Sequence, residues 1–198
     1  ETLWAIKALA RRSDIARAEP NYWRQPLATP NDPMYVEQWH YPQIRLPDAW
    51  DVTTGSPNVT VAVIDTGILS KHPDFAGQLV AGVDMISDAE NAGDGDGVDS
   101  NPEDAGDKEL GDSSSSFHGS HIAGTVAAAP NNSVGIAGVA WGSRIMPVRA
   151  LGRSGGDAFD VIQSIRFAAG LSNVSGNLPT QRADVINLSL GGTGFSQS

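Results

Sequence analysis

The sequence contains no cysteine, and this absence excludes several kinds of site. A chain without thiols cannot build a disulfide scaffold, a thiol nucleophile or a cysteine-rich zinc site. It also lacks an apolar run of the roughly 18 residues that a membrane-spanning helix needs, so we expect no membrane interaction. No signal-peptide pattern opens the chain, and a precursor signal would have been removed in any case.

Basic side chains are few. Lys and Arg number 13 against 23 Asp and Glu, which gives a net charge of -10. A nucleic-acid-binding surface needs clustered basic residues, so this class of partner is excluded. The charge is also uneven: residues 1–24 hold five basic side chains and three acids, whereas residues 84–112 hold eleven acids and one Lys.

The chain of 198 residues is long enough to bury a core, and its 22 glycines suit a closely packed interior. Hydrophobic patterns predict alternating strands and helices beyond Asn31. We expect strands over 58–64, 143–151 and 183–190, and helices over 46–53, 118–129 and 157–169. This order predicts an α/β fold with a doubly wound parallel sheet, whose ligands bind at the carboxyl ends of the strands.

The N-terminal part reads differently. Residues 2–13 have the spacing of an amphipathic helix, and residues 15–23 suggest a short strand. Residues 24–33 contain three prolines, which cannot continue either element. We therefore place a domain boundary in this stretch.

Two motifs carry candidate chemistry: VAVIDTGI at 61–68 and HGSHIAGT at 118–125. A carboxylate at the end of a buried strand can orient a histidine, which then takes a proton from a hydroxyl group. Asp65 and His118 have these positions. Other interpretations stay open: Asp65 as a turn residue, the single DTG as half of an aspartic-protease pair, or His118 and His121 as a metal pair completed by acids of the 94–112 loop.

These two motifs, followed by VRALGRSGG and INLSLGG, closely resemble the subtilisin-like serine endopeptidases, of the thermitase and secreted bacterial type. The resemblance covers residues 28–198. It implies that Asp65 orients the imidazole, that His118 acts first as general base and then as general acid, and that His121 is a structural neighbour.

The same resemblance implies a substrate site. A polypeptide substrate would lie as an added β-strand between two segments of this chain. The residues that match the family's substrate-binding segments are Ser189, Leu190 and Gly191 on one side and Gly155 and Gly156 on the other.

The sequence also departs from the family pattern. The GTSMA nucleophile motif and the oxyanion-hole asparagine are absent, and Ser189 does not sit in a nucleophile context. We therefore expect the chain to be the truncated N-terminal portion of such an enzyme, inactive alone and prone to aggregate through an uncovered sheet edge. An acidic insertion at 88–116 lengthens the spacing between Asp65 and His118.

The resemblance further implies structural calcium, since the TPNDP segment at 29–33 is typical of thermitase-type members. Carboxylate, amide and carbonyl oxygens are the ligands that Ca²⁺ accepts. The matching positions are Asp32, Asp74, Asn132 and the carbonyls of Ala129, Val134 and Ile136. Asp94, Asp96 and Asp99 have two interpretations: ligands of a second Ca²⁺, or part of a solvated acidic loop. We favour the solvated loop.

Residues 1–27 resemble the end of the family's inhibitory propeptide, which would face the acidic catalytic domain and be cleaved between Tyr22 and Thr29. The resemblance thus implies a secreted zymogen inhibited by its own propeptide. Two alternatives remain: a catalytically dead binding protein of this family, and a metal-dependent hydrolase that uses His118 and His121.

Overall fold

The structure is a computed structural model that describes residues 2–19, 29–107 and 115–192. Its centre is a sheet of four parallel strands in the order β2-β3-β1-β4. The strands are β1 (Thr60–Asp65), β2 (Val83–Asp84), β3 (Arg144–Arg149) and β4 (Val185–Leu188). Three of them fall where the sequence predicts strands, and the two-residue β2 was not predicted.

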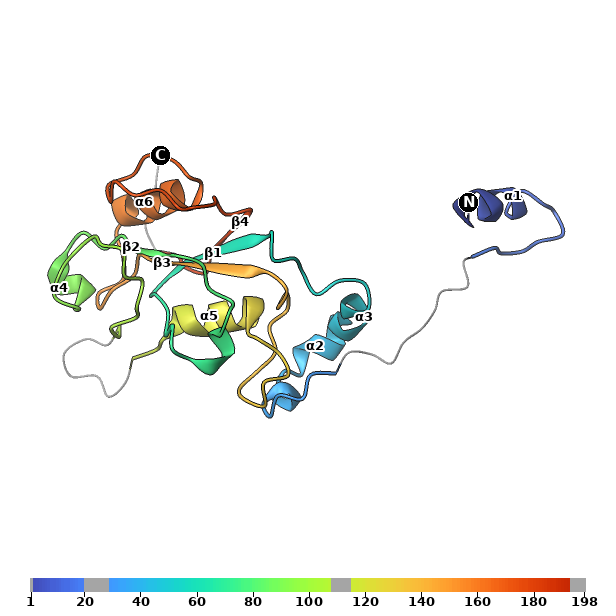
Figure 1. Ribbon diagram of the computed structural model, residues 1–198, viewed down its shortest axis with the longest axis horizontal. Helices are drawn as coiled ribbons and strands as arrows, with labels where there is room; N and C mark the ends of the chain where they lie inside the picture. Colours follow the sequence, from blue (N-terminus) through green and yellow to red (C-terminus); the bar gives the residue numbers. More distant parts are fainter. Residues whose placement is uncertain (1, 20–28, 108–114, 193–198) are drawn as a thin grey trace.

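Helices cover both faces of this sheet. Helix α5 (His118–Ala127) packs on one face against β1 and β3, and α6 (Ala158–Ala168) packs on the other, as Figure 1 shows. Each helix lies in a crossover connection between parallel strands. The predicted α/β fold with a doubly wound parallel sheet is therefore confirmed.

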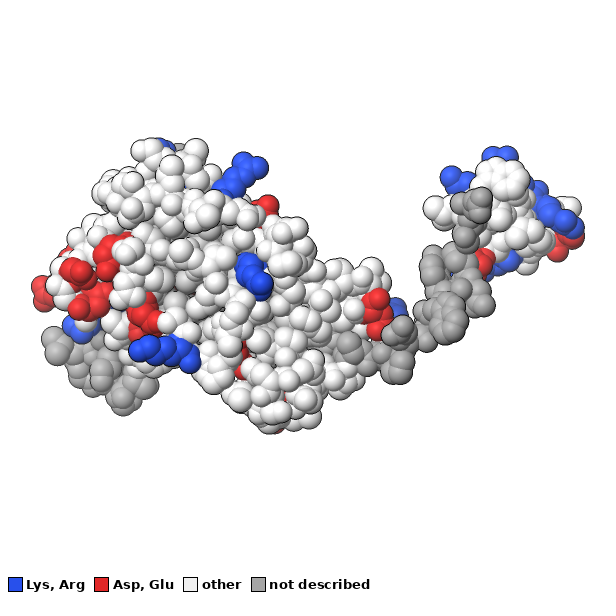
Figure 2. All heavy atoms as spheres, in the orientation of Figure 1, with Lys and Arg blue, Asp and Glu red and all other residues white. Residues whose placement is uncertain are grey.

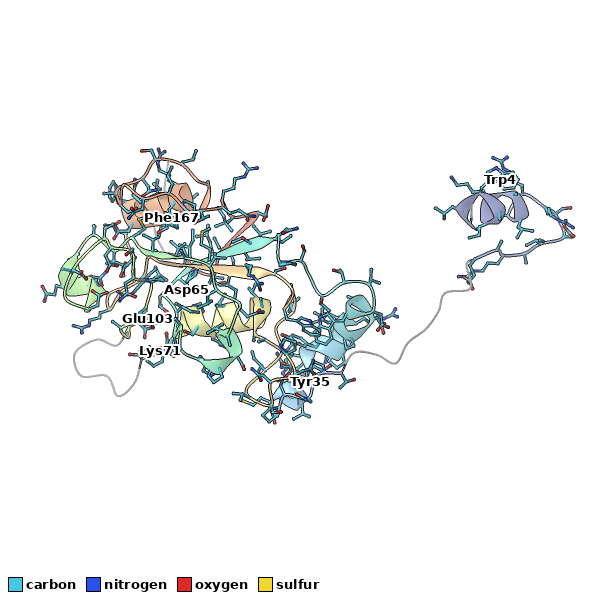
Figure 3. The ribbon with its side chains drawn as sticks, in the orientation of Figure 1. Trp4, Tyr35, Asp65, Lys71, Glu103 and Phe167 are labelled. Carbon is cyan, nitrogen blue, oxygen red and sulfur yellow. The ribbon has the colours of Figure 1, made fainter. Side chains whose placement is uncertain are left out.

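Strand β1 supplies side chains to both cores because successive residues of a strand point to opposite faces. Ala62 and Ile64 join Phe167 in the core beneath α6, whereas Val63 joins Ala123 in the core beneath α5. Figure 3 shows Phe167 between α6 and the sheet. All six residues of β1 are buried, which agrees with its unbroken apolar pattern.

A third, smaller core lies beside the sheet. It is formed by α2 (His40–Gln43) and α3 (Leu46–Trp50), and Tyr41 and Trp50 are its most buried aromatic residues. The Tyr41 hydroxyl donates to the carbonyl of Ala137 at 2.8 Å, and the Trp50 indole N–H donates to that of Val139 at 2.8 Å. These bonds hold residues 137–139, which follow α5 in the chain, against α2 and α3.

Helix α1 (Thr2–Leu9) lies apart from the sheet in Figure 1. Its apolar side chains are exposed, including Leu3 and Trp4, and within the described residues no hydrogen bond or ion pair joins residues 2–19 to the remainder. The expected packing of this helix against the acidic region is thus not seen. The strand predicted over 15–23 is wrong for residues 15–19, and its other residues lie outside the described part of the chain.

Three short helices complete the fold: η1 (Tyr35–Glu37), η2 (Pro73–Phe75) and α4 (Ala89–Ala92). None of the helices in the described residues is long and apolar enough to cross a membrane.

Candidate active site

The candidate site lies at the edge of the sheet where the parallel strands end. Asp65 is the last residue of β1, and it pairs in register with Arg149 at the end of β3. Leu188 at the end of β4 pairs with Ile64, so the segment that begins at Ser189 leaves the sheet at this same edge. This is the edge at which doubly wound folds bind their ligands.

Asp65 and His118 meet across this edge, as the sequence predicts. The Nδ1 atom of His118 lies 2.8 Å and 2.9 Å from the two carboxylate oxygens of Asp65. The Asp65 side chain is fully buried, whereas that of His118 is 42% exposed. Because an ionised carboxylate only accepts hydrogen bonds, Nδ1–H donates, and the lone pair of neutral His118 is at Nε2. This is the arrangement of a general base.

Thr66 holds the pair in place. Its backbone N–H donates to Asp65 Oδ1 at 2.8 Å, and its hydroxyl accepts the backbone N–H of Gly119 at 3.0 Å. The same hydroxyl donates to Asp104 Oδ2 at 2.6 Å. Burial raises the pKa of Asp104, although the hydrogen bonds from Thr66 and Gly106 lower it. Thr66 therefore connects the end of β1, the first turn of α5 and the acidic loop.

Gly119 allows α5 to approach β1 closely. A Cβ atom at this position would lie 2.3 Å from the carbonyl oxygen of Gly67 and 3.1 Å from the Cβ of Asp65. Any other residue would therefore push the first turn of α5 away from β1. The small-residue run after His118 is needed for the contact between His118 and Asp65.

A cavity of about 320 Å³ opens beside His118, and Thr66, Arg153 and Gly155 contribute to its lining. The structure thus places Gly155 in the lining of the cavity beside the histidine. Gly156 lines an adjoining cavity instead, and the lining beside His118 does not include the described residues 189–191. That segment is exposed after β4, where the Asn187 side chain donates to Ser189 Oγ at 2.9 Å.

Arg149 is a fully buried hub that the motif analysis missed. Its guanidinium donates to Asp84, to Asp94 at 2.7 Å, and to the carbonyls of Ala92 and Thr66. An arginine that directly follows the apolar run 145–148 of a buried strand was the available signal, because such a charge must be paired when it is buried. Arg149 thus connects Asp94 of the acidic loop to Thr66, the residue after Asp65.

The acids considered for a second calcium do not converge. Asp94 pairs with Arg149, and the Asp99 side chain accepts the backbone N–H of Asn101 at 2.8 Å. Across the described ranges, no three His, Asp or Glu residues are grouped to hold a metal ion. This finding also leaves the proposed pair His118 and His121 without further side-chain ligands in that part of the chain.

The residues predicted for the first calcium site do gather around one loop. Asp32 accepts the backbone N–H groups of Asn131 and Asn132, and Asp74 accepts the side-chain amide of Asn132 at 2.9 Å and the N–H of Ile136 at 3.0 Å. Both carboxylates are almost fully buried, and neither has a Lys or Arg partner within the described residues. The described contacts of both carboxylates are N–H groups of this loop, and the described residues contain no group of three acids or histidines that could hold a metal ion.

Comparison with known proteins decides the family. A sequence model described as the subtilase family matches residues 56–198. The chain belongs to the subtilase family. An "extracellular protease" of Xanthomonas campestris is 45% identical over 98% of this chain, and an "extracellular basic protease" of Dichelobacter nodosus is 41% identical over 96%. Thermitase of Thermoactinomyces vulgaris is 38% identical over 83% of this chain and 49% of its own length.

Solved structures agree with this assignment. Proteases from Pseudoalteromonas arctica share 46% identity with this subtilase chain, with a TM-score of 0.80 over 86% of it and 53% of their own chain. Fervidolysin from Fervidobacterium pennivorans, a keratinolytic enzyme related to subtilisin, matches with a TM-score of 0.61 and 26% identity over 93% of this chain and 25% of its own. The chain spans about a third of the Xanthomonas and Dichelobacter proteases, at 35% and 34%.

Proposed function

We propose that this subtilase chain supplies the aspartate and the histidine of a serine endopeptidase that cleaves polypeptides. The contact of His118 Nδ1 with buried Asp65 carries this proposal. In the described residues no serine hydroxyl is hydrogen-bonded to Nε2 of His118. Ser189 lacks a nucleophile context, so the attacking serine would come from another part of the protein.

The Nε2 atom of His118 suits each proton transfer of the proposed acyl-transfer reaction. Nε2 of His118 takes the proton of the serine as its oxygen attacks the carbonyl carbon of the scissile peptide. Buried Asp65 stabilises the imidazolium that forms, and His118 then returns the proton to the leaving amine. A water molecule, deprotonated by the same Nε2, attacks the acyl carbon, and Nε2 returns that proton to the serine oxygen as the ester bond breaks and the acid is released. The substrate strand would lie between Gly155–Gly156 and residues 189–191.

Substitution of the pair tests this function in the full-length protein that carries the chain. Asp65→Asn should lower kcat by about 10⁴-fold, the loss typical when a serine protease loses the carboxylate beside its histidine. His121→Ala is the matched control, because His121 is exposed on the same helix. Retention of more than about a tenth of the activity in Asp65→Asn would refute the proposal.

The same protein separates the other two candidate functions. A serine-directed fluorophosphonate should label it, whereas a catalytically dead binding protein would bind peptides and stay unlabelled. A hydrolase using His118 and His121 would lose activity in a zinc chelator and in His121→Ala. We favour neither, since His118 Nδ1 is occupied by Asp65.

We also propose that structural calcium binds between Asp32, Asp74 and the loop 129–136, where the Asn132 side chain and the carbonyls of Ala129, Val134 and Ile136 complete the ligands. When bound, the ion would neutralise two buried carboxylates and fasten that loop. Gly135 supports the geometry, since a Cβ there would lie 2.1 Å from Asp74 Oδ2. Calcium should raise the melting temperature of the chain, and Asp74→Asn should abolish that rise while Asp96→Asn keeps it. Equal shifts in both variants would contradict this site.

Residues 1–27 are proposed to be the end of an inhibitory propeptide of a secreted zymogen. The support is the separate position of α1 and the names of the extracellular relatives. The tail that would cross the cleft falls in residues 20–28, outside the described part. Mass spectrometry of the active secreted protein should find a mature N-terminus near Ala28, and an intact Glu1 would disprove the assignment.

A further inference from the structure

A second, larger cavity adjoins the one beside His118. It has a volume of about 750 Å³ and lies between α4, the turn at 152–156 and the start of α6. Its charged lining residues are Asp88, Glu90, Arg153, Asp157 and Asp160. Figure 2 shows acidic side chains gathered at this end of the molecule. We refer to it as the acidic cavity.

The walls of the acidic cavity are fixed by hydrogen bonds. The Asn91 side chain donates to the carbonyl of Gly155 at 3.0 Å and accepts the N–H of Ser154 at 2.8 Å. Asp88 caps α4 through the N–H of Glu90 at 2.9 Å, and Asp157 caps α6 through that of Asp160 at 2.8 Å. In both caps the accepting atom is the Oδ1 of the aspartate.

Asp160 lacks a donor for one of its oxygens. Its residue is only 3% exposed, and Oδ2 accepts the backbone N–H of Ser87 at 3.0 Å. Oδ1 is buried and has no hydrogen-bond partner. Burial raises the pKa of this carboxyl, the hydrogen bonds from Ser87 lower it, and the neighbouring Asp157 and Asp88 raise it further. An unpartnered buried carboxylate oxygen is costly, and a cationic donor in the cavity would relieve that cost.

The size of the acidic cavity points to an organic cation. Its volume exceeds that of a metal ion many times, and no three acids are grouped for metal binding across the described residues. The lining contains one basic side chain, Arg153, whose Nη2 donates to the carbonyl of Gly93 at 3.2 Å. Four carboxylates against one guanidinium leave a site that suits an ammonium or guanidinium group on a long stem.

The acidic cavity adjoins the cavity of the candidate active site. Arg153 and Gly155 line both this cavity and the one beside His118. A peptide bound along Gly155 and Gly156 would therefore pass both openings. We propose that the acidic cavity is a specificity subsite that accepts a lysine or arginine side chain of the polypeptide, near the residue bound beside His118. This inference rests on the proposed peptidase function.

Cleavage of peptide series by the full-length protein tests the subsite. Each peptide carries lysine, norleucine or glutamate at one position in turn, so that stem length is matched while charge changes. At one position, kcat/KM for lysine should exceed that for norleucine by about tenfold, as expected for a partly buried charge pair. Glutamate at that position should be cleaved more slowly than norleucine.

Substitutions in the lining of the acidic cavity test whether its carboxylates cause the preference for lysine. The double change Asp88→Asn and Asp157→Asn keeps both helix caps, because asparagine caps as well as aspartate, but removes two charges. It should bring the lysine-to-norleucine ratio to about one. Asp96→Asn, which removes one charge outside the lining, should keep the ratio. Equal cleavage of lysine and norleucine peptides at every position would overturn the subsite alone, whereas no cleavage of any series would overturn the peptidase function as well.

Discussion

Thr66 is the residue on which the positions of Asp65 and His118 both depend. Its hydroxyl joins Asp104 and the N–H of Gly119, and all of these groups are buried. Thr66→Val keeps the shape but leaves a carboxylate oxygen and a backbone N–H without their partner. The free energy of unfolding should fall by about 1–3 kcal/mol, measured by urea denaturation.

Thr66→Ser is the control for this substitution, since it retains the hydroxyl and should stay within about 1 kcal/mol of the original protein. If Thr66→Val lowers the stability no more than Thr66→Ser does, the hydrogen bonds of the hydroxyl are not what stabilises this site.

Asp84 gives the stability a pH dependence. Burial raises the pKa of this carboxyl to about 6, although the N–H of Ile86 and the guanidinium of Arg149 lower it. Its ordinary value is 3.8, so between about pH 4 and pH 6 the folded chain holds a proton that the unfolded chain has released. Stability from Asp84 is therefore complete below about pH 4 and falls as the pH rises, by at most about 1.4 kcal/mol per unit.

Urea denaturation from pH 4 to pH 7 checks this expectation. Asp84→Asn should show a flatter decline in the free energy of unfolding than the original chain, while Asp96→Asn should follow the original slope. An unchanged slope in Asp84→Asn would mean that Asp84 is ionised in the folded chain throughout this range.

The sequence predicted the site residues that belong to a short motif. It did not predict the residues whose role depends on partners far away along the chain. Asp65 and His118 stand in short patterns whose chemistry is legible, and their predicted contact is present. Thr66 lies inside the first motif, but its role depends on Asp104, which is 38 residues away. The hub at Arg149 depends on partners 55 to 83 residues away, and no local pattern indicates which acids a buried arginine will meet.

The first turn of α5 is the element whose position sets the geometry of the pair. Gly119→Ala would force this turn away from β1, because its Cβ would overlap the carbonyl of Gly67. We expect a loss of about 1–3 kcal/mol in stability from overpacking. We also expect about a hundredfold loss of activity in the full-length protein from displacement of His118.

Gly124→Ala is the matched control in the same helix. A Cβ at Gly124 would meet only Ile136 Cδ1 at 3.5 Å, an ordinary contact. This change should stabilise α5 by roughly 0.5–1 kcal/mol, since alanine is the better helix former, and should preserve activity. Similar losses in both variants would show that the close approach of Gly119 to Gly67 does not determine the result.

Elements with a strong period were predictable, and most of the short ones were not. Helices α5 and α6 and the strands β1, β3 and β4 carry clear apolar patterns, and each end lies within two residues of its predicted position, whereas α1 ends four residues and α3 three residues before the predicted ends. Strand β2 has two residues, too few for a period, and it forms because Val83 and Asp84 pair with the end of β3. The four-residue helices α2 and α4 depend likewise on tertiary contacts.

At the scale of the whole molecule, the charge asymmetry of the sequence becomes a spatial one. Acids of the described residues 84–107 lie near the end of the sheet that carries Asp65, and Arg149 pairs with two of them, Asp84 and Asp94. The basic residues of α1 and its neighbours lie apart from them in Figure 2. The composition of the sequence indicated both groups of charged residues. The pairing of buried Arg149 with Asp84 and Asp94 became apparent only in the folded sheet.

The outer edge of β4 predicts how the 198-residue chain behaves alone. This strand is at one end of the sheet order, and Val185 and Leu188 on it are 52% and 41% exposed. An exposed apolar edge strand pairs readily with another chain. We therefore expect the isolated chain to self-associate with rising concentration, as measured by analytical ultracentrifugation. Val185→Lys should reduce the association because a lysine on an edge strand opposes pairing, whereas Leu3→Lys, on the separate helix α1 where Leu3 is 71% exposed, should not. A chain that remains monomeric at high concentration, or one in which only Leu3→Lys reduces association, would show that the edge of β4 is not the contact surface.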